Sequence, residues 1–152
     1  MNIYNALKND HQEVKELFDE LKQPPHMNGE SRDKIFTKIK TALTSHSEAE
    51  EAVFYTQLRQ QGEVEKKIEL AVNEHNQVSR TLEVLENMDT NSATWLNKLM
   101  SLCDEVQQHI NEEEGEIFET ARRVFSQQQA REMGEQFQQA KILKKINPLH
   151  ED

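Results

Sequence analysis

Apolar residues recur along most of the chain at intervals of three and four, which is the spacing of an amphipathic α-helix. The first run, for example, places Leu7, Val14 and Leu21 on one face. We predict five such runs to be helices, over residues 3–22, 31–62, 64–85, 92–122 and 126–146.

Short segments that favour helix ends separate these runs. Pro24 and Pro25 follow the first run and Gly62 ends the second, because proline and glycine both disfavour a continuing helix. A turn at 89–92 precedes the fourth run, and Ser92 is a suitable N-cap for it.

Short connections make consecutive helices antiparallel neighbours. We therefore expect an all-α fold: an up-down-up-down antiparallel four-helix bundle over 3–122 with an additional C-terminal helix over 126–146. The 152 residues predict a single domain, 1–152. Only 4 glycines and 3 prolines, with 30% charged residues, argue against a β-sandwich.

Charge and cysteine usage exclude several function classes. A net charge of −10 argues against nucleic acid as a partner, because binding a polyphosphate needs a basic surface. Cys103 is the single cysteine, which excludes disulfide scaffolds and cysteine-ligated zinc, and its place on an apolar face predicts a buried small residue. No window is apolar enough to span a membrane or act as a signal sequence, so we expect a cytoplasmic protein that does not bind membranes.

The two halves of the chain correspond to each other at a separation of 64 residues. This separation relates Asp10 to Glu74, His11 to His75, Glu50 to Glu114 and Phe54 to Phe118. One candidate departs from the rule: His46 corresponds to position 110, whereas the histidine is at 109.

The duplicated histidines and carboxylates are typical of a site for two metal ions. Imidazole nitrogen and carboxylate oxygen are ligands of iron, manganese and zinc, and a carboxylate can bridge two metals. A single histidine on a helix is usually a packed or surface residue, but four histidines that obey one internal repeat favour metal binding. His26 and His150 lie off the repeat and are expected to be bystanders.

The expected ligand set assigns a pair of histidines to each metal. His11 and His46 would bind one metal, His75 and His109 the other, and two carboxylates would bind both; they are Glu50 and Glu114.

The second carboxylate has two candidates, Glu113 and Glu114. A step of four residues from His109 to Glu113 keeps both side chains on one face of an unbroken helix. A step of five, to Glu114, needs a locally wider turn, and single π-type turns occur mainly at functional sites. The matching positions of Phe54 and Phe118 favour Glu114, with Glu113 as the alternative.

The pattern Asp-His11, His46-x3-Glu50, Glu-His75 and His109-x4-Glu114 resembles the hemerythrin family, specifically its histidine-histidine-glutamate (HHE) cation-binding branch. The resemblance covers about residues 3–122 and includes an acid five residues after His109, which also favours Glu114. It implies a four-helix bundle around a non-heme di-iron centre with an oxo or hydroxo bridge, although manganese or zinc would suit the same ligands. It implies binding or sensing of O2, peroxide, nitric oxide or iron.

The third helix departs from the pattern of the O2 carriers in that family. Those carriers have a His-x3-His motif there, whereas Ala71 and Ser79 stand four residues to either side of His75. Four histidines in place of five would leave positions open on both metals, for water or for a carboxylate such as Glu51 or Glu74. This departure favours peroxide, nitric oxide or iron chemistry over simple O2 carriage.

We therefore expect a metal- and O2-binding protein more than an enzyme, with a small diatomic or peroxide ligand and no catalytic residues of its own. One alternative is a di-iron oxidoreductase acting on peroxide or nitric oxide. Another is a helical partner-binding module with a vestigial metal site. No nucleophile with a positioned base and no phosphate-binding loop is recognisable. The sequence does not identify a protein partner or an oligomeric state.

Overall fold

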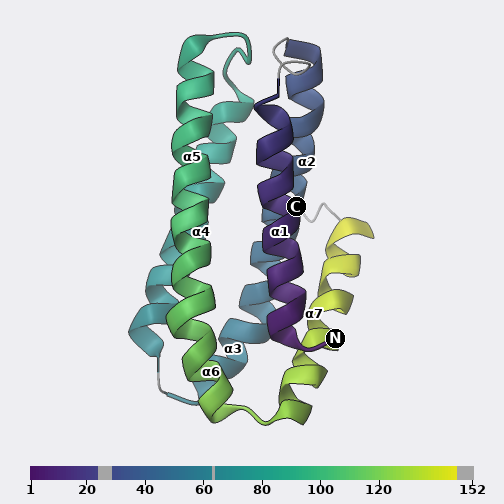
Figure 1. The fold of residues 1–152 in the computed structure, drawn as a ribbon, viewed down its shortest axis with the longest axis vertical. Coiled ribbons are helices and arrows are strands. Elements are labelled where there is room, and N and C mark those ends of the chain that lie inside the picture. The colour runs from purple at the N-terminus through teal and green to yellow at the C-terminus, as the bar shows by residue number, and fades with distance from the viewer. Residues whose placement is uncertain (24–28, 63, 147–152) are drawn as a thin grey trace.

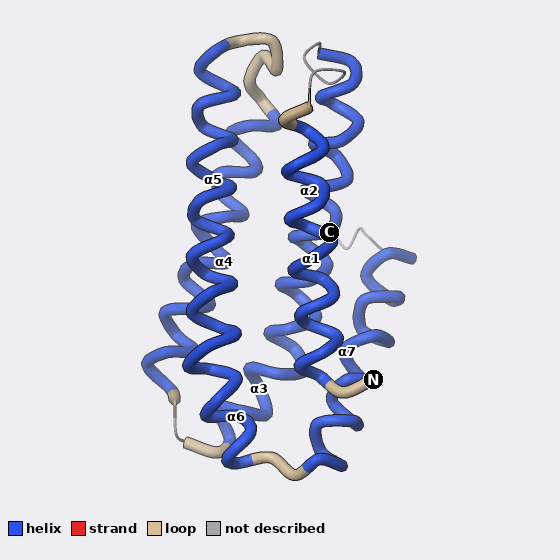
Figure 2. Tube along the Cα trace, in the orientation of Figure 1, coloured by secondary structure: helices blue, strands red, loops and turns tan. Residues whose placement is uncertain are grey.

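The computed structural model describes residues 1–23, 29–62 and 64–146, and all regular elements in these ranges are helices (Figure 2). In chain order they are α1 (Ile3–Leu21), α2 (Gly29–Glu50), the π-helical turn η2 (Glu51–Tyr55), α3 (Thr56–Gln60), α4 (Glu65–Glu86), α5 (Ala93–Glu112), the π-helical turn η3 (Glu113–Ile117), α6 (Phe118–Val124) and α7 (Gln127–Ile146).

Two of the long helices are continuous through a π-helical turn. The backbone passes from α2 through η2 into α3, and from α5 through η3 into α6, without leaving helical conformation. With α1 and α4 they form four antiparallel helices in up-down-up-down order, and α7 is the fifth helix (Figure 1). The predicted all-α bundle with an additional C-terminal helix is therefore confirmed.

The helix ends follow local sequence signals. Asn2 caps α1 by accepting a hydrogen bond from the Asn5 amide at 2.9 Å, and Ser92 caps α5 through the Trp95 amide at 3.0 Å. Gly62 has a positive φ of 74° directly after α3, a conformation that suits glycine. The expected start of the second helix at Ser31 was wrong, because α2 begins at Gly29.

The core consists of two apolar clusters separated by a polar layer. The cluster towards α3 and α6 contains the buried rings of Phe54 and Phe118, and the cluster towards the opposite end is built around Trp95. Buried histidines and glutamates lie between the clusters. The repeat thus places two hydrophobic layers around one layer of polar side chains in the middle of the bundle.

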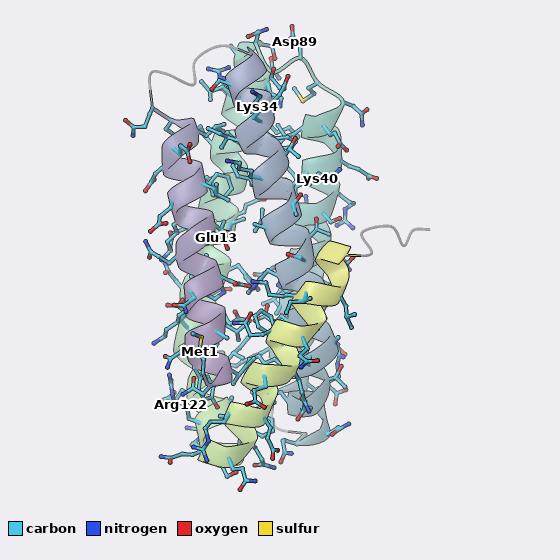
Figure 3. All side chains as sticks on the ribbon, turned by 90° about the vertical axis from the view of Figure 1, so that its right-hand side faces the viewer. Met1, Glu13, Lys34, Lys40, Asp89 and Arg122 are labelled. Carbon is cyan, nitrogen blue, oxygen red and sulfur yellow. The ribbon has the colours of Figure 1, made fainter. Side chains whose placement is uncertain are left out.

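Helix α7 packs against α1 and α2 on one side of the bundle. Figure 3 shows it crossing the bundle from the end marked by Met1 and Arg122 towards its middle. Phe137, a residue of α7, is fully buried. Gly134 of the same helix lets the N-terminal backbone approach closely, since a Cβ there would lie 2.1 Å from the Met1 carbonyl oxygen.

Other expectations concern residues outside the core. Cys103 is half-buried, and the Lys22 ammonium donates a hydrogen bond to its sulfur at 3.5 Å. The predicted bystanders His26 and His150 lie outside the described residues. Among the helices that the structure describes, none combines the length and apolar character needed to cross a membrane.

Candidate metal centre

Four helices each contribute one buried histidine to the polar layer: His11 from α1, His46 from α2, His75 from α4 and His109 from α5. The rings come close in pairs, with centroids 5.1 Å apart for His11 and His46 and 4.8 Å apart for His75 and His109. The Nε2 atom of each ring is buried and has no hydrogen-bond partner among the described residues.

Two fully buried carboxylates face these nitrogen atoms. Glu50 Oε1 lies 3.3 Å from Nε2 of both His46 and His75, and Glu113 Oε1 lies 3.2 Å from His11 Nε2. Glu50 ends α2 and Glu113 begins η3. Both therefore follow the histidine of their own helix by four residues, which keeps each His–Glu pair on one helical face.

The choice of Glu114 over Glu113 does not agree with the structure. Helix α5 stays regular through Glu112, so the residue four after His109 points into the centre. Both long helices contain a π-helical turn here, and the extra residue of the second half lies between Glu113 and Phe118, because Phe54 follows Glu50 by four residues and Phe118 follows Glu113 by five. Separations of 63 residues for both His46–His109 and Glu50–Glu113 were the available sequence signal.

Glu114 has a different place, as one of four carboxylates that accept hydrogen bonds from the outward Nδ1 atoms. The four contacts are His11 to Glu114 at 2.7 Å, His46 to Asp10 at 2.8 Å, His75 to Glu51 at 2.7 Å and His109 to Glu74 at 2.6 Å. An Nδ1–H that donates outward leaves the Nε2 lone pair directed inward, as a metal ligand requires.

Sequence reasoning missed this outer shell, and considered Glu51 and Glu74 only as extra metal ligands. The signal was present, because each outer carboxylate is adjacent in sequence to an inner residue. Asp10 and Glu74 precede histidines, and the other two follow Glu50 and Glu113. Neighbouring residues on a helix point in different directions. The inner residue of each pair therefore faces the centre, and the outer carboxylate accepts a hydrogen bond from a histidine of another helix.

The inner residues form two groups that could each hold a metal ion. We name the group of His11, His46 and Glu113 the α7-side group, and the group of Glu50, His75 and His109 the open-side group. Within each group the ligand atoms lie within 4.8 Å of one another.

Electrostatics indicate that a positive charge belongs between these atoms. Burial alone would lower the pKa of His46, but Glu50 and Asp10 raise it to about 10. Burial likewise opposes protonation of His75, and Glu50 and Glu51 raise its pKa to about 9. Inward lone pairs that face carboxylate oxygens repel each other unless a proton or a metal cation lies between them. The unpaired Nε2 and carboxylate atoms therefore fit a metal pair.

Tyr55, which the sequence did not single out, contacts both groups. It is fully buried, and its hydroxyl donates a hydrogen bond to Glu113 Oε2. Its ring stacks on His75 with centroids 5.6 Å apart and an interplanar angle of 16°. Burial raises the pKa of Tyr55 well above its usual range, and Glu113 and Glu50 add to the effect, so the phenol stays a donor.

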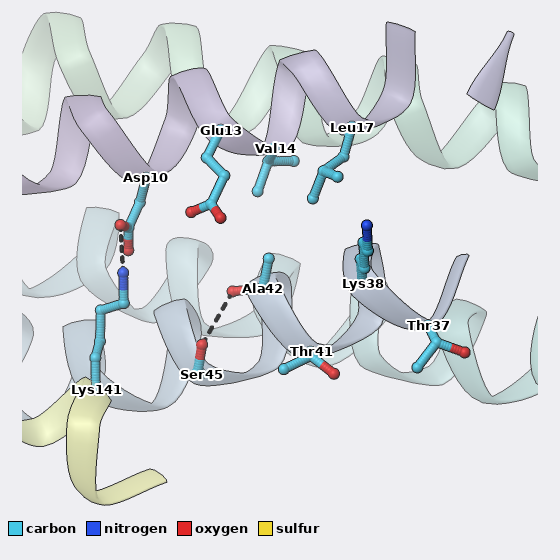
Figure 4. Close-up of a pocket in the computed structure, with 10 residues that line it drawn as sticks. All are labelled: Asp10, Glu13, Val14, Leu17, Thr37, Lys38, Thr41, Ala42, Ser45 and Lys141. Atoms are coloured by element: carbon cyan, nitrogen blue, oxygen red, sulfur yellow. Dashed lines mark hydrogen bonds and ion pairs between the residues drawn. The ribbon is translucent and has the colours of Figure 1, made fainter. Parts of the chain in front are cut away.

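Helix α7 extends the outer shell on one side. The Lys141 ammonium pairs with Asp10 (Figure 4). Asp10 in turn accepts the hydrogen bond from His46. Phe137 packs edge-on against the His46 ring, with centroids 5.8 Å apart. The predicted C-terminal helix thus takes part in positioning a candidate ligand.

Comparisons with known proteins agree with this geometry. The model of the Hemerythrin HHE cation binding domain matches residues 2–121. A DNA nickase of Nostoc sp. is 28% identical over 144 residues, which are 93% of this chain but 39% of that protein, so the chain spans well under half of its relative. The crystal structure of a hemerythrin HHE cation binding domain-containing protein from Mycobacterium kansasii superposes with a TM-score of 0.81. That comparison covers 97% of this chain and 91% of the other at 24% identity, and it shows a shared fold.

Proposed function

Because the chain belongs to the hemerythrin HHE cation binding domain family, we propose that it binds two iron ions between its four helices and uses them to bind or sense a small ligand. The ligand class is O2 or a related molecule such as peroxide or nitric oxide. The observation that carries the proposal is the set of buried polar atoms without hydrogen-bond partners: Nε2 of four histidines, both oxygens of Glu50 and Oε1 of Glu113.

The ligand types are compatible with iron. Imidazole nitrogen and carboxylate oxygen suit iron, and they also suit manganese and zinc, which are the alternatives. An iron pair would supply redox chemistry and open coordination positions. The protein's own residues would hold it through Nε2 and orient each imidazole through an outer carboxylate.

The space beside the histidines supports a small ligand. A cavity of about 30 Å³ adjoins all four rings, and apolar side chains such as Val14, Val106 and Ile110 line it. This volume holds about one to two water-sized molecules, so it suits a diatomic or peroxide ligand and is too small for an organic substrate. No fifth ligand comes from the two positions four residues to either side of His75. Ala71 is buried but has no donor atom, and Ser79 is exposed.

A role in DNA processing has less support, although the Nostoc relative is named a DNA nickase. The chain carries a net charge of −10, which repels a polyphosphate backbone. The chain also corresponds to only part of that relative.

Anaerobic loading with Fe(II), followed by exposure to air, tests the proposal. We expect about two irons per chain and a near-ultraviolet charge-transfer absorption that appears with air. The matched control is the double variant His46→Ala, His109→Ala, which should retain its helical circular dichroism and bind no iron at the centre. Equal iron in both proteins would contradict the proposal. Steady-state consumption of peroxide or nitric oxide would instead identify an oxidoreductase.

A further inference from the structure

The two halves of the centre are related by an approximate internal symmetry. Residues that correspond between the halves make corresponding contacts; the pairs are Asp10 and Glu74, His11 and His75, His46 and His109, Glu50 and Glu113, and Glu51 and Glu114. If nothing else contacted these residues, two cations bound there would have equivalent surroundings.

Tyr55 breaks this symmetry. At the separation of 63 that relates Glu50 to Glu113, Tyr55 corresponds to Phe118, which is fully buried but has no hydroxyl; at the separation of 64 that relates Phe54 to Phe118, it corresponds to Glu119. Glu119 is exposed on the surface of α6. The two tyrosines of the chain are Tyr4 and Tyr55, so no tyrosine of the second half can donate to Glu50 as Tyr55 donates to Glu113.

The consequence is an unequal number of available carboxylate oxygens. Glu113 Oε2 accepts the hydrogen bond of Tyr55, and only its Oε1 is unpaired, beside His11 Nε2. Both oxygens of Glu50 are unpaired. Stacking on His75 and complete burial hold the tyrosine ring in place, so its hydroxyl has no route to water as an alternative partner.

Building on the proposed function, we propose that Tyr55 is a positioning residue that makes the two metal positions unequal. It would restrict Glu113 to Oε1, beside His11 of the α7-side group, and leave both oxygens of Glu50 available, with Oε1 3.3 Å from Nε2 of a histidine of each group. The two cations then bind with different affinities, and the two glutamates are not interchangeable.

Stepwise titration with Fe(II) under nitrogen, in competition with a chromophoric chelator, tests the inequality. We expect two resolved steps for the wild type. Glu50→Ala should weaken both steps, whereas Glu113→Ala should weaken one by roughly 10-fold or more and leave the other within about threefold. Equal effects of the two substitutions would overturn the proposal, and this comparison does not depend on any tyrosine variant folding.

Tyr55→Phe tests the role of the hydroxyl directly. The substitution frees Glu113 Oε2, so the ratio of the two dissociation constants should shrink by roughly 10-fold, and the two Mössbauer doublets of the 57Fe-loaded protein should become more alike. Tyr4→Phe is the matched control, because Tyr4 is also buried but its hydroxyl has no hydrogen-bond partner. It should leave both readouts unchanged.

The outcomes separate this inference from the proposed function. A wild type that binds no iron would overturn both. A wild type that binds iron in two equal steps, or a Tyr55→Phe variant with wild-type steps and doublets, would overturn the inference alone.

Discussion

The α7-side and open-side groups contain the same kinds of ligand atom but lie in different surroundings. In the α7-side group, Asp10 supports His46; its side chain is 9% exposed and pairs with Lys141, whereas Glu114, which supports His11, is 29% exposed. In the open-side group, Glu51 and Glu74 support the histidines and are 35% and 31% exposed. Surface hollows reach both groups: one of about 280 Å³ is lined by Asp10 and Lys141 on the α7 side, and one of about 260 Å³ is lined by His75 and Glu51 on the other side.

This difference shows how one added helix alters a duplicated site. The two halves of the bundle provide equivalent ligands, and α7 then adds Phe137 beside His46 and Lys141 beside Asp10 in the α7-side group. When a carboxylate that accepts the Nδ1 hydrogen bond is removed, water can take its place more easily at a partly exposed position than at a buried one. We therefore expect the two groups to respond differently to equivalent substitutions.

Removal of Phe137 should have the largest effect. Phe137→Ala leaves a cavity between α7 and the bundle at a fully buried position, so we expect a loss of about 3–5 kcal/mol in the free energy of unfolding. Chemical denaturation of the metal-free protein measures it. A loss below about 1 kcal/mol would show that α7 is not packed as described.

Gly134→Ala should detach the N-terminal segment from α7. The new Cβ would lie 2.1 Å from the Met1 carbonyl oxygen, so a shift costing about 1–3 kcal/mol is expected. Gly115→Ala is the matched control, because a Cβ there meets nothing within 4 Å. Thermal unfolding should rank the control at or above the wild type, and equal melting temperatures for the two variants would contradict the close approach.

The outer carboxylates should differ in their effect on metal affinity. Asp10→Asn and Glu74→Gln both weaken an Nδ1 acceptor, and such partners typically contribute 10- to 100-fold, so we expect about 100-fold for Asp10 and about 10-fold for Glu74. Glu74 is 31% exposed to water, whereas Asp10 is 9% exposed and also pairs with Lys141, so water replaces the Glu74 acceptor more readily. Competition titrations measure both, and a larger loss for Glu74→Gln would reverse the comparison.

Metal loading should release protons. The raised pKa values of His46, about 10, and His75, about 9, mean that both rings are charged in the metal-free protein at pH 7. A metal must displace these protons, so apparent affinity should rise about tenfold per pH unit for each proton released. Potentiometry on addition of Fe(II) measures the release, and pH-independent binding would contradict the assignment.

The same pKa values predict the pH dependence of the metal-free fold. The folded values exceed the ordinary value of 6.5, so the charged histidines stabilise the fold fully below about pH 6.5. That contribution is lost as the pH rises through about 9 to 10. Denaturation midpoints of the metal-free protein, measured below about pH 6.5 and above about pH 10, check this prediction. The midpoint should be higher at the lower pH.

The sequence predicted the bundle because its hydrophobic period is regular over four long runs. The sequence also predicted that four histidines and Glu50 lie in one buried layer, since residues three or four apart share a helical face. The sequence favoured Glu114, with Glu113 as the alternative, because the repeat locates the extra residue of the second half only to within one helical turn. A regular helix up to Glu112 and a π-helical turn afterwards decide the choice.

The hydrophobic pattern of the sequence does not predict which polar side chains of different helices contact each other. Tyr55 reads as an ordinary core residue beside Phe54, and Lys141 as a charge on the polar face of the last helix. Their partners are Glu113 and Asp10, which are distant in sequence. Only the packing of η2 against η3 and of α7 against α1 reveals them.

Anomalous X-ray diffraction at the iron absorption edge, on crystals of iron-loaded protein, is the most direct test of a two-metal centre between the helices. We predict two peaks, one among His11, His46 and Glu113 and the other among Glu50, His75 and His109. Peaks confined to surface carboxylates, or no peak within the bundle, would contradict the account.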